Sequence, residues 1–111
     1  MDIMSGQEFE DLVAKLFLTM GYNTTITPVS GDQGIDIIAE NDRIKIGIQA
    51  KRNSTQVSNQ AVQEAVAGKV FYNLDRVMVV TNNYYTSSAK ELAKANHVQL
   101  WDQDEIISRL S

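Results

Sequence analysis

The chain has 111 residues, 43% of them hydrophobic and 22% charged, which predicts one globular domain spanning residues 1–111. It contains no cysteine, so disulfides and cysteine-type zinc sites are excluded. Its net charge of −4 counts against a nucleic-acid binder, because such proteins usually carry a basic surface.

Residues 1–5 contain neither a basic region nor a long apolar run, so we expect no signal peptide. No window of the sequence reaches the roughly 20 apolar residues that a membrane span requires. We therefore expect a cytoplasmic protein without a membrane partner.

The first helix is predicted to begin at Ser5, because Ser5 and Glu8 have the spacing of a capping box. Apolar residues then recur at helical spacing until Gly21 ends the run: Phe9, Leu12, Val13, Leu16, Phe17 and Met20. On a wheel of about 100° per residue, Asp11 lies opposite this stripe and Glu10 lies at its flank. Glu10 can therefore reach past the core toward a strand end, or it is a surface acid.

Three β-branched segments follow the first helix. Residues 23–29 predict an edge strand that ends at Pro28, since proline removes a ladder donor. Residues 35–40 and 43–50 predict a hairpin with its turn at residues 40–43.

Polar residues are predicted to converge at one end of this hairpin. Side chains alternate along a strand, so Gln49 and Lys51 share one face and can meet Asp36 if the strands pair. A carboxylate and an amide oxygen are hard donors that suit Mg²⁺, and Lys51 is the adjacent cation for a water or a phosphoryl oxygen. Gly31 and Gly34 allow a sharp turn or a close approach to a ligand.

The loop after the hairpin is polar and follows two cations. Arg52, Asn53 and Ser54 combine a charge, an amide and a hydroxyl, which suits contact with nucleic-acid phosphates, although a solvated loop is equally open. Ser58 is predicted to cap the second helix. The buried stripe of that helix is predicted to be Val62, Ala65, Val66 and Val70, with Gln63 and Glu64 off the stripe.

Residues 76–81 form a continuous apolar run, which predicts a central strand covered on both faces. The run leads into Asn82 and the adjacent Tyr84 and Tyr85. Asn82 and Tyr84 are candidate nucleic-acid contacts, but one or both tyrosines can instead cover the rim of the core.

The end of the chain predicts two further helices around a short strand at residues 98–101. Ser88 and Glu91 have capping-box spacing for the first of these helices, and Asp102 is the expected cap of the last. His97 is the only histidine and is expected at a helix end, which disfavours a histidine-based site.

Two stretches together carry a resemblance: Gly-Asp-Gln-Gly-Ile-Asp at residues 31–36 and Gln-Ala-Lys at residues 49–51. They resemble the Mrr-like branch of the PD-(D/E)XK nuclease superfamily, in which glutamine replaces the usual acid. The predicted order αβββαβαβα gives a mixed central sheet flanked by helices, which matches the restriction-endonuclease-like α/β core that the resemblance implies. The resemblance also favours Glu10 as a site residue. It places the second helix at the border of the site, so either Gln63 or Glu64 can support the groups that bind there.

The resemblance implies a metal-dependent DNA endonuclease. Asp36, Gln49 and the backbone carbonyl of Ala50 would bind Mg²⁺, or Mn²⁺ in its place, and Glu10 would bind the same ion through water or a second ion. Lys51 would orient the attacking water or stabilise the transition-state charge. DNA contacts are expected from Arg52, Asn53, Ser54, Asn82 and Tyr84.

Two alternatives remain open. The acidic balance and the lack of an appended recognition domain fit a nucleic-acid-binding module of the same fold with negligible turnover. A structure-specific, junction-resolving nuclease is the other alternative, although such enzymes usually keep glutamate in place of Gln49 and have a more basic surface. A homodimer is expected because cutting both strands needs two sites, and the exposed apolar candidates for the interface are Phe71, Tyr72, Tyr84 and Tyr85.

Overall fold

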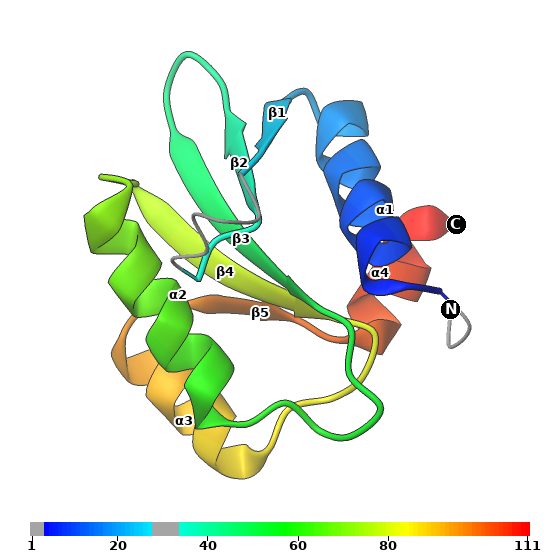
Figure 1. Ribbon diagram of the computed structural model, residues 1–111, viewed down its shortest axis with the longest axis vertical. Coiled ribbons are helices and arrows are strands. Elements are labelled where there is room, and N and C mark those ends of the chain that lie inside the picture. The colour runs from blue at the N-terminus through cyan, green and yellow to red at the C-terminus, as the bar shows by residue number, and fades with distance from the viewer. Residues whose placement is uncertain (1–3, 28–33) are drawn as a thin grey trace.

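The computed structural model describes residues 4–27 and 34–111, and within these ranges helices cover both faces of a mixed sheet (Figure 1). In chain order the elements are α1 (Gly6–Thr19), β1 (Asn23–Ile26), β2 (Ile37–Glu40), β3 (Lys45–Lys51), α2 (Asn59–Phe71), β4 (Arg76–Thr81), α3 (Ser87–Ala95), β5 (Gln99–Trp101) and α4 (Gln103–Leu110). The predicted order and fold class are confirmed. Pro28 and Gly31, which the sequence predicted at a strand end and a turn, lie outside the described residues.

The strands lie in the order β1-β2-β3-β4-β5, and the direction of pairing changes in the middle of the sheet. β1, β2 and β3 are antiparallel neighbours, with Ile37 opposite Ile48 in the hairpin. Asn41 closes the hairpin turn, because its Oδ1 accepts the N–H groups of Arg43 and Ile44 at 2.8 and 3.0 Å. β3, β4 and β5 are parallel, which requires crossovers, and α2 and α3 supply them.

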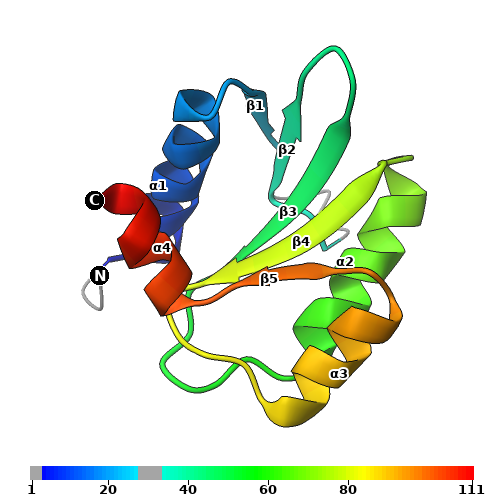
Figure 2. The same cartoon turned by 180° about the vertical axis from the view of Figure 1, so that it is seen from behind.

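A cluster of buried side chains covers each face of the sheet. On one face, α1 and α4 pack over Ile37, Ile48 and Val80. On the other face, α2 and α3 pack over Val77 and Val79. Figures 1 and 2 show the two helix pairs on opposite sides of the sheet. β4 is consequently buried on both faces, as its apolar run predicted.

Polar caps begin the helices. The hydroxyl of Ser5 accepts the Glu8 N–H at 3.1 Å and the Glu8 carboxylate accepts the Ser5 N–H at 2.9 Å, which confirms the predicted capping box of α1. Asp102 caps α4 through the Glu105 N–H at 3.0 Å, also as predicted. Ser58 stands at the N-cap of α2, but its side chain makes no capping hydrogen bond.

Two local predictions about the helices are wrong. α3 begins at Ser87 with Thr86 as its cap, whose hydroxyl accepts the Ala89 N–H at 3.1 Å, so the predicted Ser88 capping box does not begin the helix. Val70 of α2 is 80% exposed, whereas Val62 and Ala65 of the predicted stripe are buried as expected, together with Ala61 and Gly68.

The ends of several elements also differ from the apolar runs. β2 begins at Ile37, two residues later than predicted, and β3 begins at Lys45 and continues to Lys51. His97 lies just after α3 with a φ of 56°, which confirms its predicted position at a helix end.

Across the described ranges, every helix falls short of the length and apolar character that a bilayer span needs, and α1, the longest of them, has 14 residues.

Candidate active site

Asp36 and Gln49 lie near each other at the open end of the β2–β3 hairpin. The register pairs Ile37 with Ile48, and Asp36 is the residue that directly precedes β2. The Asp36 N–H donates to the Ile48 carbonyl oxygen at 2.8 Å, so Asp36 and Ile37 both lie opposite Ile48 and the regular pairing ends at Ile37. Ile37 and Ile48 are fully buried, and a slip of one residue would move both to the other face. The apolar core therefore fixes the register that brings the two polar residues together.

The carboxylate of Asp36 is held against the backbone of β3. Its Oδ2 accepts the Ala50 N–H at 2.8 Å, a charge-assisted hydrogen bond that orients the group. Thr27 braces the same segment from the side of β1, since its N–H and its hydroxyl donate to the Asp36 carbonyl oxygen at 2.9 and 3.2 Å. Asp36 is thus fixed from both neighbouring strands.

Gln49 is 6% exposed, and its two amide atoms have different surroundings. Nε2 donates to Oε1 of Glu64, on α2, at 2.7 Å. Oε1 of Gln49 is buried and has no hydrogen-bond partner in the described part of the chain. Leaving a buried acceptor unsatisfied costs about 1–3 kcal/mol, so such an atom calls for a bound group that would satisfy it.

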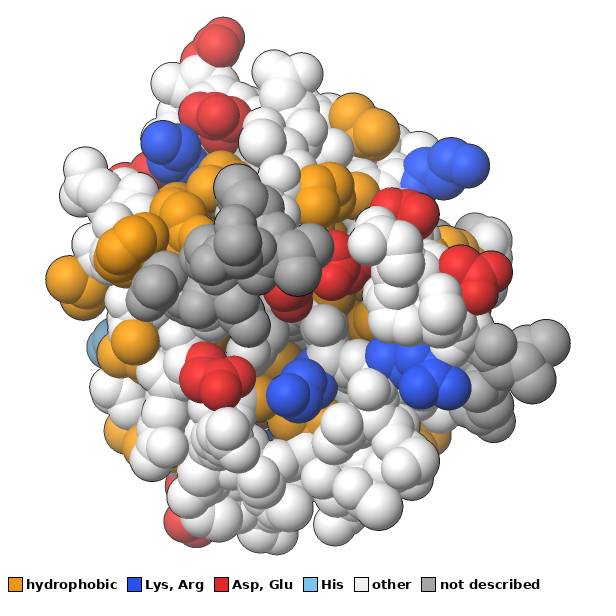
Figure 3. All heavy atoms as spheres, viewed as in Figure 1, with side chains coloured by type: hydrophobic (Ala, Val, Ile, Leu, Met, Phe, Trp, Pro, Cys, Tyr) orange, Lys and Arg blue, Asp and Glu red, His pale blue; other side chains and the backbone are white. Residues whose placement is uncertain are grey.

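Lys51 ends β3 on the same face as Gln49, two residues further along the strand. Its carbonyl oxygen accepts the Thr81 hydroxyl at 2.6 Å, and that hydroxyl accepts the Asn83 N–H at 3.2 Å. Thr81 is fully buried and so ties the carboxyl ends of β3 and β4 together. Figure 3 shows acidic and basic side chains near one another on the face that carries α2 and the end of β3.

Glu10 approaches this region from the helix layer on the other face. It lies in α1 and is half-buried, and Figures 1 and 2 both place the amino end of α1 beside the carboxyl end of β3. Asp11 is exposed and accepts the Gln7 amide at 3.2 Å, while Glu8 belongs to the capping box. The three acids of α1 therefore have the separate surroundings that the helical wheel predicted.

The residues predicted to contact DNA gather around one polar groove of about 390 Å³. The groove lies beside the loops that follow β3 and β4 and is lined by Arg52, Asn53, Ser54, Asn82, Asn83, Tyr84 and Gln103. Arg52, Ser54 and Tyr84 are exposed, whereas Asn82 is 5% exposed.

Hydrogen bonds join the two loops of this polar groove. The Asn53 N–H donates to Asn82 Oδ1 at 2.8 Å, and Asn83 Nδ2 donates to the Asn53 carbonyl oxygen at 3.2 Å. Asn82 therefore braces the Asn53 loop, and it also lines the groove in which the sequence predicted a nucleic-acid contact.

The two adjacent tyrosines differ. Tyr85 is 4% exposed, and its hydroxyl donates to the carbonyl oxygens of Val79 and Trp101 at 2.8 and 3.0 Å. Burial raises the pKa of Tyr85 far above its usual range, so the hydroxyl stays neutral. Tyr84 is 41% exposed, and its hydrogen bond to Asp104 at 2.9 Å raises the pKa of Tyr84. Tyr85 thus covers the rim of the core, and Tyr84 is the tyrosine available to a ligand.

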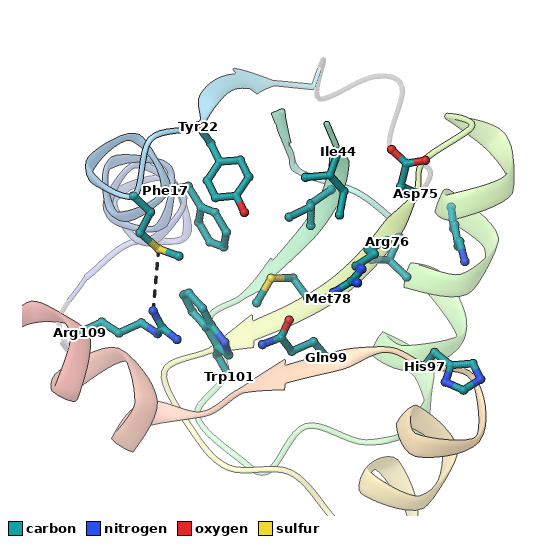
Figure 4. A pocket seen from close by; sticks show the side chains of 14 residues that line it. Phe17, Tyr22, Ile44, Asp75, Arg76, Met78, His97, Gln99, Trp101 and Arg109 are labelled. Carbon is teal, nitrogen blue, oxygen red and sulfur yellow. Dashed lines mark hydrogen bonds between the residues drawn. The ribbon is translucent and has the colours of Figure 1, made fainter. Parts of the chain in front are cut away.

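A larger groove, of about 770 Å³, lies over the amino ends of β3 and β4 (Figure 4). Arg109 of α4 borders it, with its guanidinium 4.1 Å from the Trp101 ring centroid and its Nη1 3.9 Å from Met20 Sδ. Arg76 and Gln99 also line this groove, but none of the predicted site residues does. The candidate active site is therefore assigned by its chemistry and not by the size of a cavity.

Two residues outside the hairpin hold the site. The resemblance offered Glu64 or Gln63 as a supporting group beside the site without choosing between them, and the bond of Glu64 to Gln49 joins residues 15 positions apart. Thr81 was noted only as the end of a strand, and its bond to Lys51 joins residues 30 positions apart. Neither contact has a local sequence signal, because both depend on how distant elements pack.

The donor atoms at the hairpin end fit a hard divalent cation. Asp36 contributes a carboxylate, Gln49 a buried oxygen without a partner and Ala50 a main-chain carbonyl, which are ligands that Mg²⁺ and Mn²⁺ accept. Within residues 4–27 and 34–111, no three His, Cys, Asp or Glu side chains are grouped as a metal cluster.

The mixed five-stranded sheet with flanking helices is the α/β fold of the restriction endonucleases. The hairpin of this sheet carries a carboxylate, an amide and an ammonium at one end. This chain belongs to the restriction endonuclease family of the Mrr catalytic type, because the family model described as "Restriction endonuclease" matches residues 1–110. The resemblance drawn from the sequence is thereby confirmed, and family membership supports nuclease activity on DNA. No significant match is found among curated proteins.

Solved structures with the same fold include a crystal structure of AF1548, a protein of unknown function, with a TM-score of 0.76 and 19% identity over 89% of this chain and 63% of that one. The MspJI restriction endonuclease, in complex with a 27-mer oligonucleotide, has a TM-score of 0.66 and 18% identity over 92% of this chain and 27% of that one. AspBHI, a DNA modification-dependent restriction endonuclease, has a TM-score of 0.69 and 17% identity over 92% of this chain and 30% of that one. At these identities the structures establish the fold, and this chain spans less than two thirds of each of them.

Proposed function

We propose that this chain is a metal-dependent DNA endonuclease domain of the Mrr-like restriction type, which hydrolyses phosphodiester bonds. The observation that carries the proposal is the buried Oε1 of Gln49, which has no partner among the described residues, next to Ala50, whose N–H donates to the Asp36 carboxylate. An oxygen with no hydrogen-bond donor near it is poorly suited to a purely structural role, whereas a cation satisfies it.

The chain's own residues divide the work of the reaction. Asp36, Gln49 and the Ala50 carbonyl would hold Mg²⁺ or Mn²⁺, and Glu10 would hold the same ion through water or a second ion. The chemistry such an ion would supply is polarisation of the scissile phosphate and acidification of a bound water. Lys51 orients the attacking water or offsets the charge that develops on the phosphoryl oxygens. Because Gln49 is neutral, we expect weaker metal binding than with glutamate at this position.

DNA would lie along the polar groove at the ends of β3 and β4. Arg52, Asn53 and Ser54 would contact phosphates, and Tyr84 would pack on a sugar or a base. The net charge of −4 limits the electrostatic attraction, so we expect weak and salt-sensitive binding by this chain alone. The MspJI structure, which contains an oligonucleotide, supports DNA as the partner.

A homodimer would supply the two active sites that cutting both strands requires. Phe71 is 63% exposed, and its ring packs edge-on against the Tyr72 ring with 4.9 Å between the ring centroids. The end of α2 is therefore a candidate surface for contact between two subunits. Light scattering on the purified protein measures the mass in solution, and a monomer at all concentrations would contradict this part of the proposal.

Plasmid cleavage in the presence of Mg²⁺ or Mn²⁺ tests the proposed activity. Asp36→Ala and Lys51→Ala should abolish cutting, whereas the exposed residues Asp11 and Lys90 supply matched control variants, Asp11→Ala and Lys90→Ala, that should cut normally. Undiminished cutting by both site variants would end the assignment.

A second candidate is a nucleic-acid-binding module with negligible turnover. It is favoured by the net charge of −4. A mobility shift of duplex or branched DNA, without cleavage under either metal, would select this candidate over the first.

A further inference from the structure

Glu64 fixes the orientation of the Gln49 side-chain amide. Its Oε1 accepts Gln49 Nε2 at 2.7 Å, and its Oε2 accepts Gln60 Nε2 at 3.2 Å. A carboxylate can only accept hydrogen bonds, so the amide nitrogen of Gln49 must be the atom that faces it. Turning the amide over would bring two oxygens within hydrogen-bond distance without a proton between them. The bond to Glu64 therefore directs Gln49 Oε1 away from α2.

The main chain at Glu64 is packed against the segment that leads into β2. Gly34 precedes Asp36 by two residues and has a φ of 82°. A Cβ added to Gly34 would lie 2.2 Å from the Glu64 carbonyl oxygen and 2.7 Å from its carbonyl carbon. Only glycine permits this approach. This turn of α2 thus contacts the segments that carry both Asp36 and Gln49.

We propose that Glu64 is a positioning residue for Gln49, an inference that rests on the proposed metal-dependent function. It turns Gln49 Oε1 toward the cation site, and its negative charge is the reason that position 49 holds an amide. A glutamate at position 49 would place two carboxylates within hydrogen-bond distance, where they repel each other. The pair needs one carboxylate and one amide, and exchanging them should preserve the bond with its polarity reversed.

Melting temperatures of the metal-free protein test the pairing. Gln49→Glu should melt at least about 4 °C below wild type, and the exchange variant Gln49→Glu/Glu64→Gln should recover most of that loss. If each substitution lowered the melting temperature independently, the exchange variant would melt below Gln49→Glu, so a recovered melting temperature shows that the two residues interact. A Gln49→Glu protein that melts with wild type, or an exchange variant that melts no higher than Gln49→Glu, would overturn the proposal.

Calorimetric titration with Mn²⁺ tests the positioning. Glu64→Ala should bind Mn²⁺ about 10- to 100-fold more weakly, as is typical when a group that orients a metal ligand is removed. Gln63→Ala, an exposed neighbour on the same helix, is the control and should bind as wild type does. Wild-type affinity in Glu64→Ala, alongside lost binding in Asp36→Ala, would overturn the role of Glu64 while leaving the proposed function intact.

Failure of wild type to bind Mn²⁺ and to cut DNA would instead overturn the proposed function and with it the cation role of Gln49. The melting temperatures of the metal-free variants would still decide whether Glu64 and Gln49 form the proposed pair.

Discussion

Replacing Gly34 with alanine tests the contact between the hairpin and α2, and two costs add at this position. The φ of 82° lies in the left-handed region, where alanine is strained by about 1–2 kcal/mol. The new Cβ would also lie 2.2 Å from the Glu64 carbonyl oxygen, so the two segments must separate by more than 1 Å to reach an ordinary contact of 3.4 Å. Overpacking of this kind costs about 1–3 kcal/mol. We therefore expect Gly34→Ala to lower the free energy of unfolding by about 2–5 kcal/mol.

Urea unfolding followed by circular dichroism measures the free energy of unfolding of Gly34→Ala. Substitutions at two other glycines, measured in the same way, distinguish the backbone strain from the overpacking. Gly21 has a φ of 98° with no atom within 4 Å of an added Cβ, so Gly21→Ala carries only the backbone strain of about 1–2 kcal/mol. Gly6, in α1, has neither feature, and Gly6→Ala should be neutral or stabilising by up to about 1 kcal/mol. If Gly34→Ala destabilises the protein no more than Gly21→Ala does, the close packing of Gly34 on α2 is refuted.

Three changes elsewhere test other parts of the structure. Tyr85→Phe removes the donor to two buried carbonyl oxygens and should cost about 1–2 kcal/mol in thermal unfolding, and an unchanged melting temperature would show that these bonds contribute nothing. The pKa of Glu8 is lowered by its hydrogen bond from the Ser5 N–H, so the stability that this carboxylate provides is complete above pH 4.5 and is lost as the pH falls through the lowered pKa. Glu8→Gln should therefore be less stable than wild type at neutral pH and converge with it in acid, whereas a difference independent of pH would contradict this origin. Arg52→Ala should weaken DNA binding for all sequences and reduce the slope of log K against log salt by about 1, and a slope equal to that of wild type would exclude a phosphate contact.

The elements with strong local signals lie where the sequence predicted them. The capping box of Ser5 and Glu8 and the apolar run of β4 involve residues close in the chain, and both are observed. In α2, apolar residues occur at more positions than one face can hold, so periodicity selected the buried face only in part. Val62 and Ala65 are buried as predicted, whereas Val70 lies in solvent and the small residues Ala61 and Gly68 pack in addition.

The candidate site also contains some contacts that the sequence could predict and others that it could not. Alternation along two paired strands predicted that Asp36 and Gln49 converge. The regular pairing reaches only to Ile37, and Asp36 contacts β3 through the Ala50 N–H that its carboxylate accepts. The contacts that hold them from outside the hairpin could not be predicted, since Glu64 and Thr81 belong to elements whose docking depends on the whole core. Burial of Asn82 likewise follows from the packing of two loops and not from its own sequence neighbours.

Diffraction from crystals grown with MnCl₂ tests the metal site most directly. We predict an anomalous peak about 2.1 Å from an Asp36 carboxylate oxygen and from Gln49 Oε1, with Gln49 Nε2 still donating to Glu64. A Mn²⁺ ion bound elsewhere, or a Gln49 amide that does not touch it, would contradict the proposal that this hairpin end is the catalytic metal site.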